Sequence, residues 1–174
     1  GCGDGALLRS LTNGGYLDGK SVYAVDLSES RLELVRQINP EIICLPADVC
    51  DVPIVGSSVD VVISTQVIEH VDDDAQMAKE IYRIASPNGM VYVATVFKKW
   101  YGWYFYRCNG KWTIDPTHLR EYNKDNQLLD ALTEAGLEIV ATKKTLDGRP
   151  LLDAVLKRVQ ASRSVYDNRF LKRL

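Results

Sequence analysis

The chain begins with a glycine-rich segment, GCGDGA, of a kind that can hold a nucleotide. Gly1, Gly3 and Ala6 fit the spacing G-x-G-x-x-A, and Asp26 follows about twenty residues further on. In such loops glycine allows a tight turn and a close approach of the ligand, while the acidic side chain accepts hydrogen bonds from ribose hydroxyls. Glycine turns also end strands for purely structural reasons, so this segment alone leaves both interpretations open.

Alternating helices and strands must position these residues. Apolar residues at helical spacing predict helices over 6–13, 29–38, 73–86 and 124–135. Apolar, β-rich runs predict strands over 21–28, 41–49, 59–71 (continuing into a loop), 90–97 and 137–145. The expected helix boundaries are the N-caps Ser28 and Asn123 and the helix ends at Gly14-Gly15, Pro87-Asn88-Gly89 and Gly136.

This alternation predicts an α/β fold, a Rossmann-like doubly wound parallel sheet with helices on both faces. Asp26 would end a strand at the carboxyl edge of the sheet, where ligands bind in open α/β folds. Its two acceptor oxygens suit a ribose diol, and an N-cap or a surface acid is the structural alternative.

The composition is that of one soluble globular domain spanning residues 1–174, with 46% hydrophobic and 25% charged residues. A net charge of -2 gives no general electrostatic reason to expect a nucleic-acid partner. The 4 cysteines have irregular spacing without a CxxC pair, which favours reduced thiols and a cytoplasmic protein. The sequence shows neither a signal peptide nor the roughly 18 consecutive apolar residues of a membrane span.

Five segments in order resemble the class I S-adenosylmethionine-dependent methyltransferases, in the group related to the ubiquinone-biosynthesis and small-molecule methyltransferases. They are GCGDG, VDLS, PADV, VDVVISTQVIEHV and EIYRIASPNGMVYVAT, and with the following residues they cover the chain to about residue 146. The resemblance implies a methyltransferase that uses S-adenosylmethionine as cofactor. It also implies the strand order 3-2-1-4-5-7-6, with the seventh strand antiparallel and the first strand upstream of Gly1. We therefore expect an N-terminally truncated chain that, alone, is unstable or aggregates through two exposed strand edges.

The resemblance assigns cofactor-binding residues along the carboxyl edge of the sheet. In the loop, glycine gives clearance for the methionine and ribose parts of the cofactor, and Cys2 would contact it through main chain. Asp26 would bind the ribose hydroxyls, and Leu27 and Val49 would flank the adenine. Asp48 would accept a hydrogen bond from the adenine amine, with a helix cap as its structural alternative. The full set of expected cofactor-binding residues is Gly1, Cys2, Gly3, Gly5, Asp26, Leu27, Ala47, Asp48, Val49 and Gln66.

The segment QVIEHV is similar to the E-x-x-E-H sequence that binds a divalent metal in the ubiquinone-pathway O-methyltransferases and in enzymes that methylate the 3′ end of small RNAs. By that resemblance Glu69, His70 and His118 could converge on one ion. Gln66, however, stands where the first carboxylate should be and removes a negative charge. The ligand set is then incomplete for a hard cation, so we expect no metal here.

His118 is the best candidate for acid–base work, with His70 as the second catalytic residue. Methyl transfer from a sulfonium is helped mainly by positioning, and a base matters only where the accepting hydroxyl or amine must lose a proton. Histidine suits this task because its pKa lies near neutrality. The structural alternative is that His118 ties its loop to the next helix. Arg120 and Tyr122 could contact substrate or brace the same turn.

Residues 98–122 are an expected substrate-side insertion, with the aromatic and basic sequence KKWYGWYFYR near its start. It could cover an apolar acceptor, stack on a base, contact a membrane, or serve as a hydrophobic cap or dimer contact. Residues 150–174 could form a closing strand or a helix followed by a basic tail. We expect methyl transfer to an oxygen or nitrogen of a small or lipid-linked acceptor. We expect no nucleic-acid partner, and the sequence leaves peripheral membrane contact and a homodimer as open alternatives. A metal-assisted RNA 2′-O-methyltransferase and a non-catalytic cofactor-binding module are the alternatives.

Overall fold

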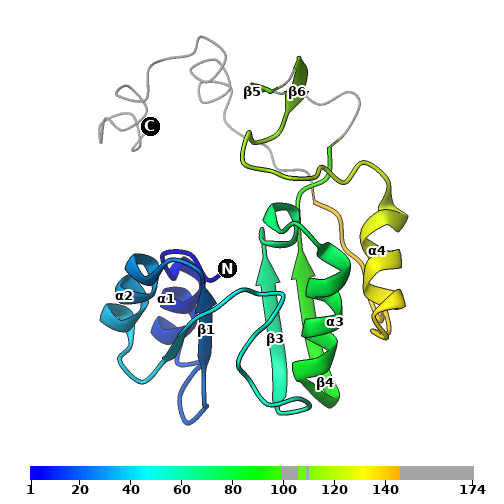
Figure 1. Ribbon diagram of the computed structural model, residues 1–174. Helices are drawn as coiled ribbons and strands as arrows, with labels where there is room; N and C mark the ends of the chain where they lie inside the picture. The colour runs from blue at the N-terminus through cyan, green and yellow to red at the C-terminus, as the bar shows by residue number, and fades with distance from the viewer. Residues whose placement is uncertain (99–105, 109, 146–174) are drawn as a thin grey trace, which may run out of the picture.

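The computed structural model describes residues 1–98, 106–108 and 110–145 (Figure 1). The helices are α1 (Ala6–Asn13), α2 (Glu29–Ile38), α3 (Asp74–Ile84) and α4 (Asp125–Glu134), with a short 3₁₀ helix η1 (Ile68–His70). The strands are β1 (Tyr23–Asp26), β2 (Ile43–Pro46), β3 (Val59–Thr65), β4 (Ala85–Ala94), β5 (Tyr106–Cys108) and β6 (Lys111–Thr113). The predictions made for most of the KKWYGWYFYR segment and for residues 150–174 lie outside the described residues.

The strands of the α/β core pair in parallel. β1 pairs with β2 and β3 pairs with β4, while β5 and β6 form an antiparallel hairpin. The two strands of each pair are also neighbours in the expected order, where β1 and β2 are the second and third strands and β3 and β4 the fourth and fifth. Within the described residues no ladder joins β1 to β3, and the two strands stand apart in Figure 1. The complete order of seven strands stays a prediction.

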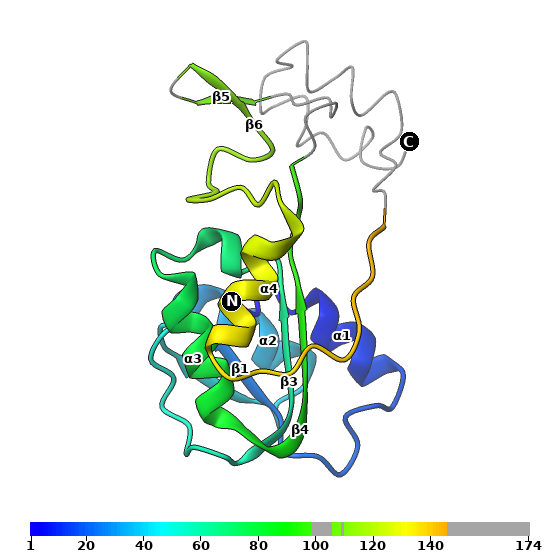
Figure 2. The same cartoon turned by 90° about the vertical axis from the view of Figure 1, so that its right-hand side faces the viewer.

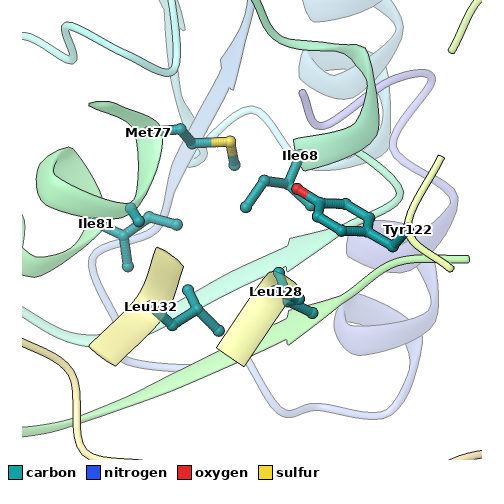
Figure 3. Packing of buried hydrophobic residues seen from close by; sticks show 7 residues of the cluster. Ile68, Met77, Ile81, Tyr122, Leu128 and Leu132 are labelled. Atoms are coloured by element: carbon teal, nitrogen blue, oxygen red, sulfur yellow. The ribbon is translucent and has the colours of Figure 1, made fainter. Parts of the chain in front are cut away.

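Each parallel pair packs against helices through its own hydrophobic core. Around β1 and β2 the buried residues are Ala24, Leu32, Val35 and Ile42. Beside β3 and β4 the larger core consists of Ile68, Met77, Ala78, Ile81, Tyr122, Leu128 and Leu132 (Figure 3). Figure 2 shows α3 and α4 side by side next to the β3–β4 pair, and the β5–β6 hairpin beyond the carboxyl ends of these strands. Because η1 and the segment at Tyr122 belong to one core, this core fixes the loops at that end of the sheet.

The junction between α3 and β4 differs from the prediction. The helix ends at Ile84, and Ala85 already pairs with Val59, whereas we expected the helix to reach residue 86 and the strand to begin at residue 90. The pairing then jumps to Val61 with Met90, so the residues between bulge out of the ladder. Pro87 explains why the helix does not reach Ser86, because a proline disfavours helical backbone in the residue before it.

Two further local predictions were wrong. Residues 137–145 form no strand in the structure, although Leu137 and Ile139 pack against the larger core. Alternating burial alone does not make a strand when no neighbour pairs with its backbone. The N-cap of α4 is Lys124 and not Asn123. The Gln127 side chain accepts hydrogen bonds from the backbone N–H groups of Asn123 and Lys124, at 2.9 and 3.0 Å.

Other boundaries agree with the prediction. Ser28 is the N-cap of α2, α1 ends at its C-cap Gly14, and Gly136 follows α4 with a φ of 102°. The Ser28 hydroxyl contacts Ser30 Oγ and does not cap the helix. Among the described helices, none combines the length and apolar character that crossing a bilayer requires.

Candidate functional site

The buried carboxylate of Asp26 joins the glycine loop to the end of β1. Its Oδ2 accepts a hydrogen bond from Gly3 N at 2.9 Å, and its Oδ1 accepts one from Ser28 N at 2.9 Å. Asp26 is only 4% exposed. Each carboxylate oxygen has about two acceptor positions, so one position on each oxygen remains for a vicinal diol. The arrangement therefore holds two acceptors side by side where the resemblance placed the ribose.

Asp26 stays ionised at neutral pH. Burial alone would raise the pKa of this carboxyl, but the hydrogen bonds from the backbone of Ser28 and Gly3, together with nearby positive charges that include Arg31, leave the pKa below its ordinary value. A charged acceptor forms stronger hydrogen bonds than a neutral one. This supports the expected use of Asp26 as a ligand-binding group rather than a surface acid.

The glycine loop lies close to both halves of the fold. Cys2 N donates to Val25 O at 2.8 Å, so the chain entering the loop runs beside β1. A Cβ atom on Gly1 would lie 2.5 Å from the side chain of Val67, which follows β3. Gly3 has a left-handed φ of 59°, and a Cβ atom there would meet nothing within 4 Å. At position 1 glycine is required because a Cβ atom would collide with Val67. At position 3 it is favoured by the left-handed backbone, and the space next to Gly3 is open.

The residues expected around adenine follow β1 and β2. Leu27 is 76% exposed directly after Asp26, and Ala47 N donates to Asp26 O at 3.3 Å. Asp48 Oδ1 accepts a hydrogen bond from Cys50 N at 2.8 Å, so this side chain closes a turn and does not cap a helix. Val49 is partly buried against the larger core. Leu27 is therefore available to a ligand, whereas Val49 also serves the fold.

Gln66 has an unusual backbone conformation at the end of β3. Its φ is 56°, in the left-handed region that side chains other than glycine rarely adopt, and its N–H donates to Ala94 O at 2.9 Å. Such strain persists only where the surrounding structure holds it. The conformation turns the chain from β3 into η1, next to the glycine loop at Val67.

Glu69, His70 and His118 come together at the carboxyl end of β3. One potential ligand atom from each residue lies within 4.8 Å of the others. The two imidazole rings pack edge to face with 4.7 Å between their centroids. Glu69 is fully buried and its Oε2 accepts a hydrogen bond from Thr95 Oγ1 at 2.8 Å. The residues that the resemblance grouped thus form a real cluster, which we call the imidazole–carboxylate cluster.

The loop that carries His118 is held against η1. Leu119 N and Arg120 N both donate to Glu69 O, at 3.0 and 3.3 Å. The Arg120 guanidinium donates to Ile68 O at 3.3 Å and to Asp72 O at 2.7 Å. It also lies 3.4 Å from Asp74 Oδ1.

Tyr122 holds the same loop from its other end. Its hydroxyl donates to Asp74 Oδ2 at 2.8 Å. Tyr122 is also buried in the larger core (Figure 3). Of the two roles left open for Arg120 and Tyr122, the structure supports bracing of the turn.

Sequence reasoning missed three polar partners of this cluster: Thr95, Asp115 and Thr117. His70 Nδ1 lies 3.1 Å from Thr117 O, and Asp115 Oδ1 accepts from Thr117 N and Thr117 Oγ1, at 2.8 and 2.6 Å. Burial alone would raise the pKa of Asp115, but the hydrogen bonds from Thr117 and the nearby charges of His118 and His70 leave this pKa below its ordinary value. The sequence DPTH carries a signal for this turn, because Asp before Pro favours a turn and an Asp side chain can accept from the backbone N–H two residues on.

Comparison with known proteins gives the family. Residues 1–93 match the family described as "Methyltransferase domain", which is more than half of the chain. The chain belongs to the methyltransferase domain family. A probable S-adenosylmethionine-dependent methyltransferase of Mycobacterium tuberculosis is 33% identical over 135 residues, which are 77% of this chain and 47% of that protein. A ubiquinone biosynthesis O-methyltransferase of Bartonella tribocorum is 23% identical over 149 residues, 80% of this chain and 59% of that protein.

A solved structure agrees in fold. A SAM-dependent methyltransferase of Thermotoga maritima superposes with a TM-score of 0.61 at 22% identity, over 80% of this chain and 62% of that one. The expected Rossmann-like class I fold, the family and its cofactor S-adenosylmethionine are therefore confirmed. The chain spans about half the length of the mycobacterial relative.

Proposed function

We propose that this methyltransferase domain binds S-adenosylmethionine along the edge formed by the glycine loop, β1 and β2, and transfers its methyl group to an oxygen or nitrogen of a small or lipid-linked acceptor. The observation that carries this proposal is the buried, ionised Asp26, whose two oxygens are fixed by the backbone of Gly3 and Ser28. A rigid pair of charged acceptors suits a ribose diol. Gly3 leaves the space beside it open for the cofactor.

The reaction is an in-line displacement. A lone pair on the acceptor attacks the methyl carbon, the bond from that carbon to sulfur breaks, and the electron pair stays on sulfur to give S-adenosylhomocysteine. The acceptor hydroxyl or amine loses its proton, and a group within hydrogen-bond reach of the acceptor must receive or release it. His118 and His70 are the candidate groups for this proton, because imidazole is the side chain most often used as a general base and the two rings lie together beyond the strained turn at Gln66.

The chemistry of the cluster favours an acceptor with an ionisable hydroxyl. Asp115, whose pKa stays below its ordinary value in part through His118 and His70, would stabilise an imidazole that has taken the proton of the acceptor. The similarity to a ubiquinone biosynthesis O-methyltransferase supports oxygen over nitrogen as the methylated atom.

Calorimetry with S-adenosylmethionine and S-adenosylhomocysteine tests the cofactor half of the proposal, with a nicotinamide dinucleotide as the negative control. The expected result is saturable binding of one adenosyl ligand per chain and no binding of the dinucleotide. A panel of phenols, catechols, amines and lipid extracts with radiolabelled cofactor then tests the acceptor half. Binding without methylation of any acceptor, including RNA, would leave a cofactor-binding module and overturn the catalytic proposal.

A further inference from the structure

We propose that residues 151–159, LLDAVLKRV, form an amphipathic helix that covers the outer face of the β3–β4 pair. The outer face is the side of these two strands away from α3 and α4. Residues 151–159 lie outside the described part of the chain, so their place is inferred from the exposed face, from the position of residues 137–145 and from their own sequence. The outer face carries four apolar side chains: Val61 and Ile63 of β3, and Met90 and Tyr92 of β4.

The four outer side chains form one exposed apolar patch. The ladder pairs Val61 with Met90, and the second outer pair follows two residues further on, so all four project from the same side of the strands. They are between 44% and 69% exposed. The residues that alternate with them pack instead against the larger core, which contains residues of α3 and α4; they are Val62, Val91 and Val93. Parallel strands are normally covered on both faces, so the patch marks a place where another segment binds.

The last described residues lead to this side of the sheet. Figure 2 shows residues 137–145, in orange, running from the end of α4 to the side of the β3–β4 pair away from α3 and α4. Leu137 packs against the larger core, whereas Val140 is exposed. Residues 146–150 can extend by about 3.4 Å each and so span up to about 17 Å. The chain can therefore continue from Thr145 onto the outer face without crossing the sheet again.

The sequence of residues 151–159 has the period of a helix. At about 100° per residue, its large apolar side chains fall within about 140° of the helix circumference, and its charged side chains fall outside this stripe. The residues of the stripe are Leu151, Leu152, Val155, Leu156 and Val159. In a strand, charged residues would alternate with apolar ones on both faces, so neither face could be buried. The sequence therefore favours a helix over the closing strand.

The helix and the outer face each lack a partner that the other supplies. A helix of this length is marginal alone in water, because nucleation is costly and tertiary packing must stabilise it. Packing the apolar stripe on the patch also removes both apolar surfaces from water. The short link to Thr145 gives the segment an effective concentration on the order of mM, which favours it over a second copy of the chain at μM concentration.

Alkylation of a thiol placed on the outer face tests the proposal in the full-length protein. Met90→Cys replaces the most exposed of the four side chains, and Glu41→Cys supplies an exposed reference thiol outside the face. Mass spectrometry follows each modified peptide, so the native cysteines do not interfere. The thiol at position 90 should react with a maleimide at least about tenfold more slowly than the thiol at position 41, which corresponds to about 1.4 kcal/mol of docking.

Two substitutions in the segment, each combined with Met90→Cys, show whether the segment is the cover. Val155→Asp places a charge in the middle of the apolar stripe and should raise the rate at position 90 to that of the reference thiol. Ala154→Asp introduces the same charge one residue away but outside the stripe, and it should leave the protection unchanged. Calorimetry with S-adenosylmethionine on the same samples reports the cofactor site separately, since neither the proposal nor its test depends on methyl transfer.

Protection that Val155→Asp removes and Ala154→Asp keeps supports the docked helix, whether or not the protein methylates any acceptor. Equal rates at positions 90 and 41 mean that the outer face is open, and they overturn the proposal. Protection that survives Val155→Asp also overturns it, because something else then covers the face: a second copy of the chain if the protection falls on dilution, and a different segment if it does not. Loss of protection with both substitutions contradicts the apolar stripe.

Discussion

Replacing Asp26 with asparagine should weaken the binding of S-adenosylmethionine more than it weakens the fold. The amide keeps one acceptor oxygen, so it can satisfy Gly3 N or Ser28 N but not both, and its NH₂ group then faces the other N–H. An unsatisfied buried donor costs about 1–3 kcal/mol. We expect the free energy of unfolding to fall by that amount.

The effect on the cofactor is larger, because the variant also loses charge. A hydrogen bond to a charged acceptor contributes about 1.5–3 kcal/mol. In the proposed site the carboxylate accepts one such bond from each ribose hydroxyl. The substituted amide would retain at most one weaker bond, so the loss is about 2–4 kcal/mol. At about 1.4 kcal/mol per tenfold, Kd should rise between about 30-fold and about 1,000-fold.

Calorimetry with S-adenosylmethionine measures the change, and thermal melting shows whether the variant is folded. Asp60→Asn, an exposed carboxylate at the other end of β3, is the matched control and should bind normally. Leu27→Ala is the second probe, because this exposed side chain can be removed without loss of core. A folded Asp26→Asn protein that binds the cofactor within about threefold of wild type would refute the assignment of the ribose site.

Three other perturbations test the local structure. Gly3→Ala should cost about 1–2 kcal/mol of stability through its left-handed φ of 59°, and it should weaken cofactor binding, since the new Cβ projects into open space; unchanged binding would argue against a ligand there. Glu80→Ala should lower the free energy of unfolding by about 2–4 kcal/mol, because it removes the acceptor of the buried Val52 N–H and the partner of Arg83, with Glu80→Gln as the milder control in urea titrations. The Arg83 hydrogen bond lowers the pKa of Glu80, so this contribution should be present above pH 4.5, the ordinary value, and lost as pH falls through the lower folded pKa. Burial raises the pKa of the Cys50 thiol to about 11, so mass spectrometry should find slow alkylation at pH 8 that accelerates toward pH 11; rapid reaction at pH 8 would contradict the burial.

The elements that depend on local sequence were predictable. The glycine loop, the acid at the end of β1 and the N-cap position of Ser28 are each set by residues within about thirty positions of one another, and the structure has them where expected. The hydrogen bond from Gly3 N to Asp26 was not predicted, because the fingerprint assigns the acid to the ribose and does not say what else holds it.

The elements that depend on distant partners were not predictable. Residues 137–145 have the apolar alternation of a strand, but a strand also needs a neighbour that sequence periodicity does not reveal. The β5–β6 hairpin was missed although Asn109-Gly110, a favoured hairpin dipeptide, lies in the sequence between its strands. Thr95 and Thr117 are ordinary polar residues until tertiary packing brings them to Glu69 and His70.

The hydrogen bonds that hold Asp26 and those that hold the loop of His118 join residues at very different separations along the chain. Gly3 and Asp26 are 23 positions apart, whereas His70 and Thr117 are 47 apart and Ile68 and Arg120 are 52 apart. During synthesis, the residues proposed to bind the nucleoside, from Gly1 to Gln66, are therefore made before His118, the last residue proposed to handle the proton. If His118 handles the proton as proposed, an opening of its segment would stop methyl transfer while the adenosyl group stays bound, because separate contacts hold Asp26 and His118.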